Sequence, residues 1–315
     1  MTNRTTVTTF LLVAFSGCWK CQFSIFALFL LVYIMTILEN LLIILLILQD
    51  LRLWKPMYFF LGNLSFLEIW YISVTLPNLL VNILTGNREI FYSACIAQLF
   101  IFTFLGAAEC YLLSAMAYDR YIAICNPLQY TIIMQNNCVL CLLICSWLGG
   151  FLTPILPIWF MIKLDFCGPN QVEHYFCDAS PLVRLACGDK KVKEIVDFVV
   201  SVLVLISSLL VIFITYTYIT LAIMKMSSSH GRFKAFSTCI SHLSVVCIFY
   251  GTMGFTYMRV EGGSTFSTNK LISVFYSVVT PMLNPVIYSL RNEDVKLALR
   301  KVLINYKCLK GHITW

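Results

Sequence analysis

The sequence predicts an all-α integral membrane protein: a seven-transmembrane helix bundle followed by a short amphipathic eighth helix. Composition and the placement of charge lead to this prediction. Of the 315 residues, 60% are hydrophobic and only 12% are charged, and the mean hydropathy is +0.85. An ordinary soluble domain carries about 25% charged residues, so this chain has too little charge to cover a water-facing surface. The composition therefore excludes a soluble enzyme, a disordered regulator and a nucleic-acid-binding protein.

Long runs without Asp, Glu, Lys or Arg, such as residues 198–224, mark the membrane spans. A helix needs about 20 apolar residues to cross the roughly 30 Å hydrocarbon core. Backbone groups in lipid must pair internally, which leaves helices or a closed barrel, and the runs lack the alternation of barrel strands. Seven spans are expected in a transmembrane domain over 24–290, near residues 24–49, 57–82, 95–125, 138–162, 195–225, 234–259 and 269–290.

Seven spans place the two chain ends on opposite sides of the membrane. Lys and Arg are slightly more numerous on the side of the C-terminus, which weakly favours a cytoplasmic tail. The sequon Asn3-Arg4-Thr5 has meaning only if the N-terminus reaches the lumen. We therefore expect a multi-pass plasma-membrane protein with residues 1–23 extracellular and 291–315 cytoplasmic. In that tail, residues 293–303 mix apolar and basic side chains, which predicts an amphipathic helix lying on the membrane lipids.

Four cysteines fall on the predicted extracellular side, where disulfides persist. Cys95 opens the third span, and Cys167, Cys177 and Cys187 lie in the loop after the fourth span. Four cysteines allow three pairings, and the residues alone do not choose among them.

Three carboxylates interrupt the predicted spans: Glu39, Glu68 and Glu109. Each lies about three turns from the inner end of its helix, roughly 16 Å along the axis and near the bilayer midplane. A charged carboxylate there costs roughly 2.5–3.5 kcal/mol. Our hypothesis is that Glu68 and Glu109 share a proton or a small cation, with Asn284 nearby. The alternative is one neutral, hydrogen-bonded carboxylic acid on each helix. No other cofactor and no metal centre is expected.

Two motifs at the inner ends of spans three and seven suit a conformational switch. Span three ends in a ten-residue block, Met116 to Cys125, that contains Asp119, Arg120 and Tyr121. Asp119 can hold Arg120 at rest and release it later. Span seven carries Asn284, Pro285 and Tyr288. Pro285 removes a backbone donor and leaves the carbonyl of Pro281 open to Asn284 or water, which predicts a hinge. Together the two motifs resemble those of the rhodopsin-like G-protein-coupled receptors.

Further blocks narrow the resemblance to the olfactory receptor family: residues 56–61, 234–243 and 249–252, together with the long loop and its three cysteines. The resemblance implies bridges Cys95–Cys177 and Cys167–Cys187, a glycosylated Asn3, and coupling to the stimulatory olfactory-type heterotrimeric G protein, which raises cAMP. The chain departs from the family pattern at Glu68, where Asp is more frequent, and at Gln129, where Arg is usual. The acid at position 68 keeps its chemistry, whereas the loss of a cation at position 129 puts the strength of coupling in doubt.

The resemblance also implies a small, volatile odorant bound within the helix bundle under the long loop. Helix geometry bounds the candidate ligand residues to Phe102, Thr103, Gly106, Ala107, Val200, Ser201, Val204, Tyr250, Met253, Tyr257 and Ser277. These side chains would line a mostly apolar cavity with a few hydroxyl groups, which suits small neutral molecules. The alternative for each residue is plain helix packing.

The expected mechanism is a shift between inactive and active states. Arg120 would leave Asp119 and approach Tyr216 and Tyr288, and a crevice lined by Lys234 and the 126–130 loop would receive the G protein. A secondary transporter could use midplane carboxylates, but it would usually show repeated halves and broken helices, which we do not find. An enzyme is poorly supported because the histidines are scattered without metal-ligand spacing.

Overall fold

The computed structural model describes residues 7–14, 19–167, 170–257, 273–291 and 294–302. Asn3 and the chain beyond residue 302 lie outside this part, as do the side chains of Lys234, Tyr257 and Tyr288. The principal helices are α1 (Trp19–Gln49), α2 (Pro56–Thr85), α3 (Tyr92–Cys125), α5 (Asn136–Leu152), α6 (Ile155–Ile162), α8 (Lys191–Lys225), α9 (Ser229–Tyr257) and α11 (Thr280–Arg291). Shorter helical segments are η1 (Leu51–Leu53), α4 (Tyr130–Ile133), α7 (Ala179–Leu185) and the π-helical η2 (Phe275–Val279).

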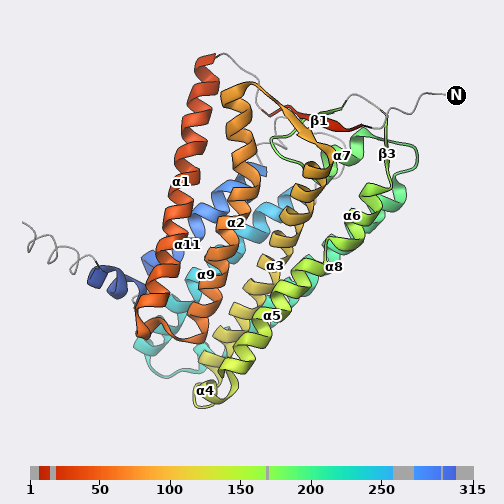
Figure 1. Cartoon of the computed structure of the whole chain (residues 1–315). Coiled ribbons are helices and arrows are strands. Elements are labelled where there is room, and N and C mark those ends of the chain that lie inside the picture. Colours follow the sequence, from red (N-terminus) through yellow and green to blue (C-terminus); the bar gives the residue numbers. More distant parts are fainter. Residues whose placement is uncertain (1–6, 15–18, 168–169, 258–272, 292–293, 303–315) are drawn as a thin grey trace, which may run out of the picture.

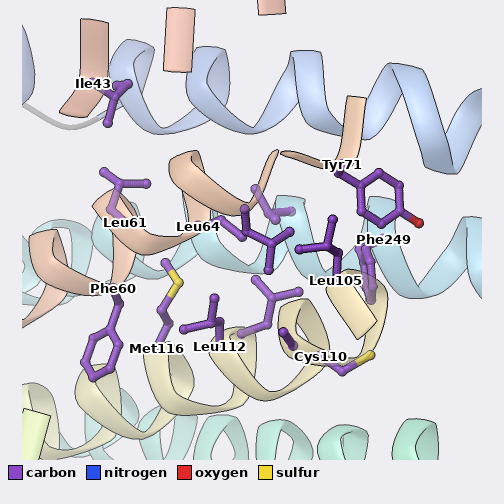
Figure 2. Packing of buried hydrophobic residues seen from close by; sticks show 14 of the residues in the cluster. Ile43, Phe60, Leu61, Leu64, Tyr71, Leu105, Cys110, Leu112, Met116 and Phe249 are labelled. Carbon is purple, nitrogen blue, oxygen red and sulfur yellow. The ribbon is translucent and has the colours of Figure 1, made fainter. Parts of the chain in front are cut away.

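The long helices form a bundle, with the short strands and α7 at one end and α4 at the other (Figure 1). Helix α3 is its axis, since it packs against α2, α5, α8 and α9. The core along α3 is apolar and tightly filled. Leu112, Leu113 and Met116 are fully buried, and Leu112 and Met116 lie across from Phe60 and Leu64 of α2, while Leu61 points toward Ile43 of α1 (Figure 2). Gly150 of α5 lies so close to Ala108 that a Cβ there would meet the Ala108 Cβ at 2.6 Å.

The outward faces are apolar too. Phe198, Leu203 and Phe213 of α8 are 64–71% exposed, a pattern that a soluble monomer avoids and that lipid accepts. In the described part of the chain, five helical segments are long and apolar enough to cross a membrane, and two shorter apolar helices lie within Cys239–Gly254 and Phe275–Ile287. This architecture is the seven-helix membrane bundle that the sequence predicts.

Helix bounds differ from the predicted spans in several places. Helices α1, α8 and α9 begin several residues before the apolar runs, because a helix continues beyond the hydrocarbon wherever its backbone bonds are satisfied. The predicted fourth span is divided into α5 and α6 at Thr153 and Pro154. Proline at that point removes a backbone donor from the helix ladder. The seventh begins, within the described residues, at Ser273 and includes the π-helical η2.

A small sheet covers the end of the bundle that carries the long loop (Figure 1). Strand β1 (Thr9–Leu12) lies between β2 (Glu89–Phe91), antiparallel, and β4 (Gln171–Val172), parallel. A second pair joins β3 (Asp165–Phe166) to β5 (Ala186–Cys187). Phe10 and Leu12 of β1 are fully buried in a second apolar cluster with Val172. The predicted N-terminal segment thus contributes a strand that the sequence analysis did not anticipate.

At the opposite end, residues 294–302 are helical, as expected for an eighth helix. Val295 and Ala298 are buried against the bundle, and Asp294 accepts hydrogen bonds from Lys55 Nζ at 2.6 Å and from the Tyr58 hydroxyl at 3.0 Å. These contacts join the segment to the α1–α2 connection.

Candidate functional site

The long loop inserts three aromatic side chains into the disulfide end of the bundle: His174, Tyr175 and Phe176, which we name the loop plug. All three are buried. His174 Nε2 lies 2.9 Å from the Ser273 hydroxyl. The Tyr175 hydroxyl donates to Ser277 Oγ at 2.5 Å, because Ser277 uses its own proton on the Ser273 carbonyl. The loop plug thus fills the interior of the bundle at the disulfide end and bonds to Ser273 and Ser277 of the seventh helical segment.

Two disulfides hold the loop that carries the plug. Cys95 at the start of α3 is joined to Cys177, and Cys167 is joined to Cys187. Beside the first bridge, the Cys177 amide donates to Gln98 Oε1 at 2.9 Å, and Gln98 Nε2 donates to the Val74 carbonyl at 2.6 Å. The loop is therefore bonded directly to α3 and linked to α2 through Gln98.

Of the predicted ligand residues of α3, Phe102 contacts the loop plug. The Phe102 ring is 4.6 Å from Phe176, 4.9 Å from Tyr71 and 6.0 Å from Tyr276, measured between centroids. Ala107 is buried, and Gly106 faces the Tyr71 ring. Thr103 is half-buried and its hydroxyl donates to the Leu99 carbonyl, so that donor is already used within its own helix.

The predicted ligand residues on the other helices include two that form side-chain hydrogen bonds and others that are only partly buried. Tyr250 is buried and donates to Ser208 Oγ at 2.7 Å, while Ser277 is engaged by the loop plug. Met253 and Val204 are partly buried against the core. Val200 and Ser201 are also half-buried. The structure thus brings Phe102 and Ser277 into contact with the plug, places Gly106 against Tyr71, and joins Tyr250 to Ser208 of α8.

Two grooves open elsewhere on the bundle, and neither is lined by a predicted ligand residue. One, of about 300 Å³, lies between α3, α5 and α8. The other, of about 430 Å³, lies along α6. The predicted ligand region is instead occupied by the aromatic rings of the loop plug and α3.

Glu68, Glu109 and Asn284 meet in the middle of the bundle, and all three are at most 2% exposed. Asn284 Nδ2 donates to Glu68 Oε1 and lies 3.5 Å from Glu109 Oε1. Within the described residues, Glu68 Oε2 and Asn284 Oδ1 have no hydrogen-bond partner. Such oxygens are the ligands that hard cations prefer, and a proton on either carboxyl group would also supply a donor. Nowhere in the described part of the chain do three or more His, Cys, Asp or Glu side chains form a group suited to a metal ion.

The hinge in the seventh segment has a partner that the sequence analysis missed. The carbonyl of Pro281, left without its helical donor by Pro285, accepts a hydrogen bond from Asn40 Nδ2 at 3.3 Å. Asn40 is fully buried and also donates to the Thr36 carbonyl. Asn284 instead turns toward the carboxylates. The predicted partner of the Pro281 carbonyl, Asn284 or water, is thus replaced here by an amide from α1.

At the opposite end of α3, the structure places Asp119 and Arg120 in direct contact. Arg120 donates to Asp119 Oδ2 through Nη2 at 2.7 Å and through Nε at 3.1 Å. Asp119 is fully buried, and its second oxygen accepts a hydrogen bond from the Tyr130 hydroxyl of α4 at 2.8 Å. Burial and the neighbouring carboxylate raise the pKa of Tyr130, so its proton stays on this bond. Tyr121, next to the pair, is half-buried with its ring 5.8 Å from Tyr218.

Tyr216 of α8 is held by a histidine that the sequence analysis did not assign. Its hydroxyl lies 2.8 Å from His242 Nδ1, and His242 Nε2 lies 3.0 Å from the Leu113 carbonyl of α3. A carbonyl can only accept, so Nε2 carries the proton and Nδ1 accepts from Tyr216. One buried imidazole thereby joins α3, α8 and α9.

The fold and the contacts at its two ends together define a class of protein. The fold is a seven-helix membrane bundle with a plugged, disulfide-bonded end and a buried Asp–Arg pair at the other end. Squid rhodopsin, a solved structure, matches it with a TM-score of 0.72 over 91% of this chain and 82% of that chain, at 17% identity. At that identity the likeness shows the fold, which is the rhodopsin fold of the G-protein-coupled receptors.

The particular family follows from sequence comparison. Residues 29–306 match the family model described as olfactory receptor. Human olfactory receptor 6Q1 is 52% identical over 302 residues, covering 95% of both chains, and rat olfactory receptor 226 is 46% identical over 94% of this chain and 92% of its own. The chain belongs to the olfactory receptor family. It is a membrane signalling receptor and not an enzyme, and its family binds odorants and acts with G proteins.

Proposed function

We propose that this receptor binds small, mostly apolar volatile ligands inside the bundle and activates the stimulatory olfactory-type G protein, which raises cAMP. The observation that carries the proposal is the separation of two sites along α3. Phe102 contacts the loop plug near one end, and Arg120 pairs with Asp119 at the other. A ligand at the first site can act on the second only through the helices between them.

The ligand site supported best lies between the loop plug and α3. The side chains around it are aromatic and aliphatic, with hydroxyls from Tyr175 and Ser277. The buried imidazole of His174 is hydrogen-bonded to Ser273. A small neutral molecule could replace the ring contacts of Phe102 and exchange hydrogen bonds with these hydroxyls. We place Val200, Ser201, Val204, Met253 and Tyr257 at the edge of the same site.

Activation would proceed by release of two buried contacts. The Tyr250–Ser208 and Tyr216–His242–Leu113 hydrogen bonds hold α8 and α9 on α3 in the present state. A ligand that favours the active state would weaken them and move the inner half of α9 outward. Arg120 would then exchange Asp119 for Tyr216 and Tyr288. The crevice between Lys234 and residues 126–130 would receive the G protein. Leu128 in that loop is 93% exposed and available for apolar contact.

The proposed setting is the plasma membrane, with the N-terminus, Asn3 glycosylation and both disulfides on the extracellular side. Disulfides persist in oxidising compartments, which supports this orientation. The tail from residue 291 onward would then lie in the cytoplasm.

Glu68 and Glu109 are proposed to share a proton or a small cation beside Asn284. The unpartnered Glu68 Oε2 and Asn284 Oδ1 support this, because either occupant would satisfy a buried oxygen. The test is basal and agonist-induced cAMP as Na⁺ and pH are varied, in Glu68→Gln and Glu109→Gln receptors. Unchanged sensitivity to both ions in both variants would refute the shared site.

The experiment that tests the overall proposal is an odorant panel applied to transfected cells, read by cAMP, with surface expression measured in parallel. We expect at least one agonist, with loss of its response in Arg120→Ala at normal surface expression. A full response in Arg120→Ala, or ligand flux without cAMP, would contradict the proposal. A panel run with other G-protein readouts separates a wrong transducer from a wrong ligand site.

A further inference from the structure

A groove of about 430 Å³ runs along the membrane-facing side of α6. One side chain comes from α3, Phe100, and the others come from α6: Ile155, Leu156, Ile158, Trp159 and Ile162. Four of the α6 side chains are 46–57% exposed. In a helix that crosses a membrane, such side chains contact lipid. The eight residues of α6 extend about 12 Å, which fits within one leaflet of roughly 15 Å, half the hydrocarbon core.

The cation of Lys163 lies at the end of this groove nearest the disulfides. Lys163 is the residue that caps α6, and its Nζ lies 4.5 Å from the centroid of the Trp159 ring. A lysine over an indole face is attracted by the ring quadrupole. Tryptophan and lysine are also the residues that gather where hydrocarbon meets headgroups. The Trp159 ring therefore lines the groove and also makes a cation–π contact with Lys163.

We propose that this groove binds one phospholipid of the surrounding membrane, with its phosphate on Lys163 and one acyl chain along α6. Charge complementarity selects this occupant. The groove itself is apolar and accepts a hydrocarbon chain, while the cation at its end needs an anion at headgroup depth. A sterol would leave Lys163 without an anion, and free phosphate would leave the groove without an apolar occupant.

The test uses the full-length receptor reconstituted in vesicles that contain phosphatidylcholine with a photoreactive group on one acyl chain. Labelling of the peptide that contains residues 155–163 is measured by mass spectrometry. We expect Lys163→Gln to lower this labelling on the order of fivefold, the effect of losing one hydrogen bond to the phosphate. Lys163→Arg should retain it. A photoreactive diacylglycerol with the same chains should label this peptide as weakly as phosphatidylcholine labels the Gln variant.

Lys225→Gln is the matched control, because Lys225 is an exposed lysine at the far end of α8 and should leave labelling of 155–163 unchanged. Inorganic phosphate should not compete, whereas competition would indicate a free-phosphate site and overturn the lipid assignment. Equal labelling of Lys163→Gln and the unaltered receptor, or equal labelling by diacylglycerol, would also overturn it. The test needs no odorant and no G protein, so its outcome is independent of the proposed signalling function.

Discussion

The two ends of α3 are joined to neighbouring parts of the chain by different kinds of bond. At one end, Cys95 is bonded covalently to the long loop and Gln98 pairs with backbone on both sides. At the other end, Asp119 is held by noncovalent bonds to Arg120 and Tyr130, one charged and one neutral partner. A disulfide persists until it is reduced, whereas a hydrogen-bonded ion pair can exchange partners as the structure moves. The comparison indicates a fixed ligand end and a reversible signalling end.

The largest effect is expected from removing the disulfide at the fixed end of α3. The Cys95–Cys177 bridge spans 82 residues, and closing a loop of that length contributes about 4–5 kcal/mol to stability in the chain-entropy account. We expect Cys95→Ser to abolish most surface expression, measured with an antibody to an N-terminal tag. The control is Cys247→Ser, which removes an exposed free cysteine and should express normally. Normal expression of Cys95→Ser would show that this end does not depend on its covalent bond.

The next effect concerns the reversible end. Asp119→Asn removes the charge that holds Arg120, a contact of the kind worth about 1.5–3 kcal/mol. If that energy favours the inactive state, ligand-independent cAMP should rise about tenfold or more relative to surface receptor. The matched control is Asp294→Asn, which breaks a partly exposed pair with Lys55 worth about 1 kcal/mol or less. A silent Asp119→Asn receptor would contradict the assigned role of the pair.

One chemical change applied at both ends sharpens the comparison further. Tyr175→Phe and Tyr130→Phe each remove one hydroxyl group and its hydrogen bond, to Ser277 and Asp119 respectively. A typical bond contributes about 1 kcal/mol, or roughly fivefold in an equilibrium. Tyr175→Phe should shift agonist potency and leave basal cAMP unchanged, whereas Tyr130→Phe should raise basal cAMP. Identical dose–response changes in the two variants would remove the functional distinction between the ends.

The smallest expected effect is a pH dependence at the disulfide end. Burial raises the pKa of Asp178 to about 6 from its usual 3.8, with Asp197 adding to the rise and the Ala179 amide and Lys193 opposing it. The folded state therefore binds this proton more tightly than the unfolded state, and stability increases as the pH falls from about 6 to about 4. Thermal unfolding of purified receptor should show this increase, and Asp178→Asn should reduce it. An unchanged slope in that variant would assign the dependence to other groups.

At the signalling end, protonation of two aspartates at low pH lowers the stability of the folded state instead of raising it. Hydrogen bonds from Arg52 hold the pKa of Asp50 well below its usual range, and the contact with Lys55 lowers the pKa of Asp294. Their contributions are present above the usual pKa of an aspartate and are lost only at still lower pH. Within the window from pH 6 to 4, Asp50 and Asp294 should therefore contribute little change in stability.

The bundle could be predicted from the sequence because lipid imposes a simple rule. Runs such as 198–224 hold no charge, and an uncharged run of that length has no stable state in a membrane other than a helix. The family could be recognised from contiguous blocks, such as the one around Asp119 and Arg120, whose residues are neighbours in the chain. The meeting of Glu68 with Asn284 was also inferable, since each lies at a depth that helix length determines.

Only the tertiary structure decided which distant groups bond to one another. The loop plug of His174, Tyr175 and Phe176 has no periodic pattern, and its burial depends on a loop that folds back between helices. Likewise, Asn40 reaches the Pro281 carbonyl and His242 joins Tyr216 to α3 because of the rotation of each helix about its axis. Sequence spacing sets the depth of a side chain, but side-chain packing between helices sets the direction it faces. That direction determines the partners of every polar group in the site.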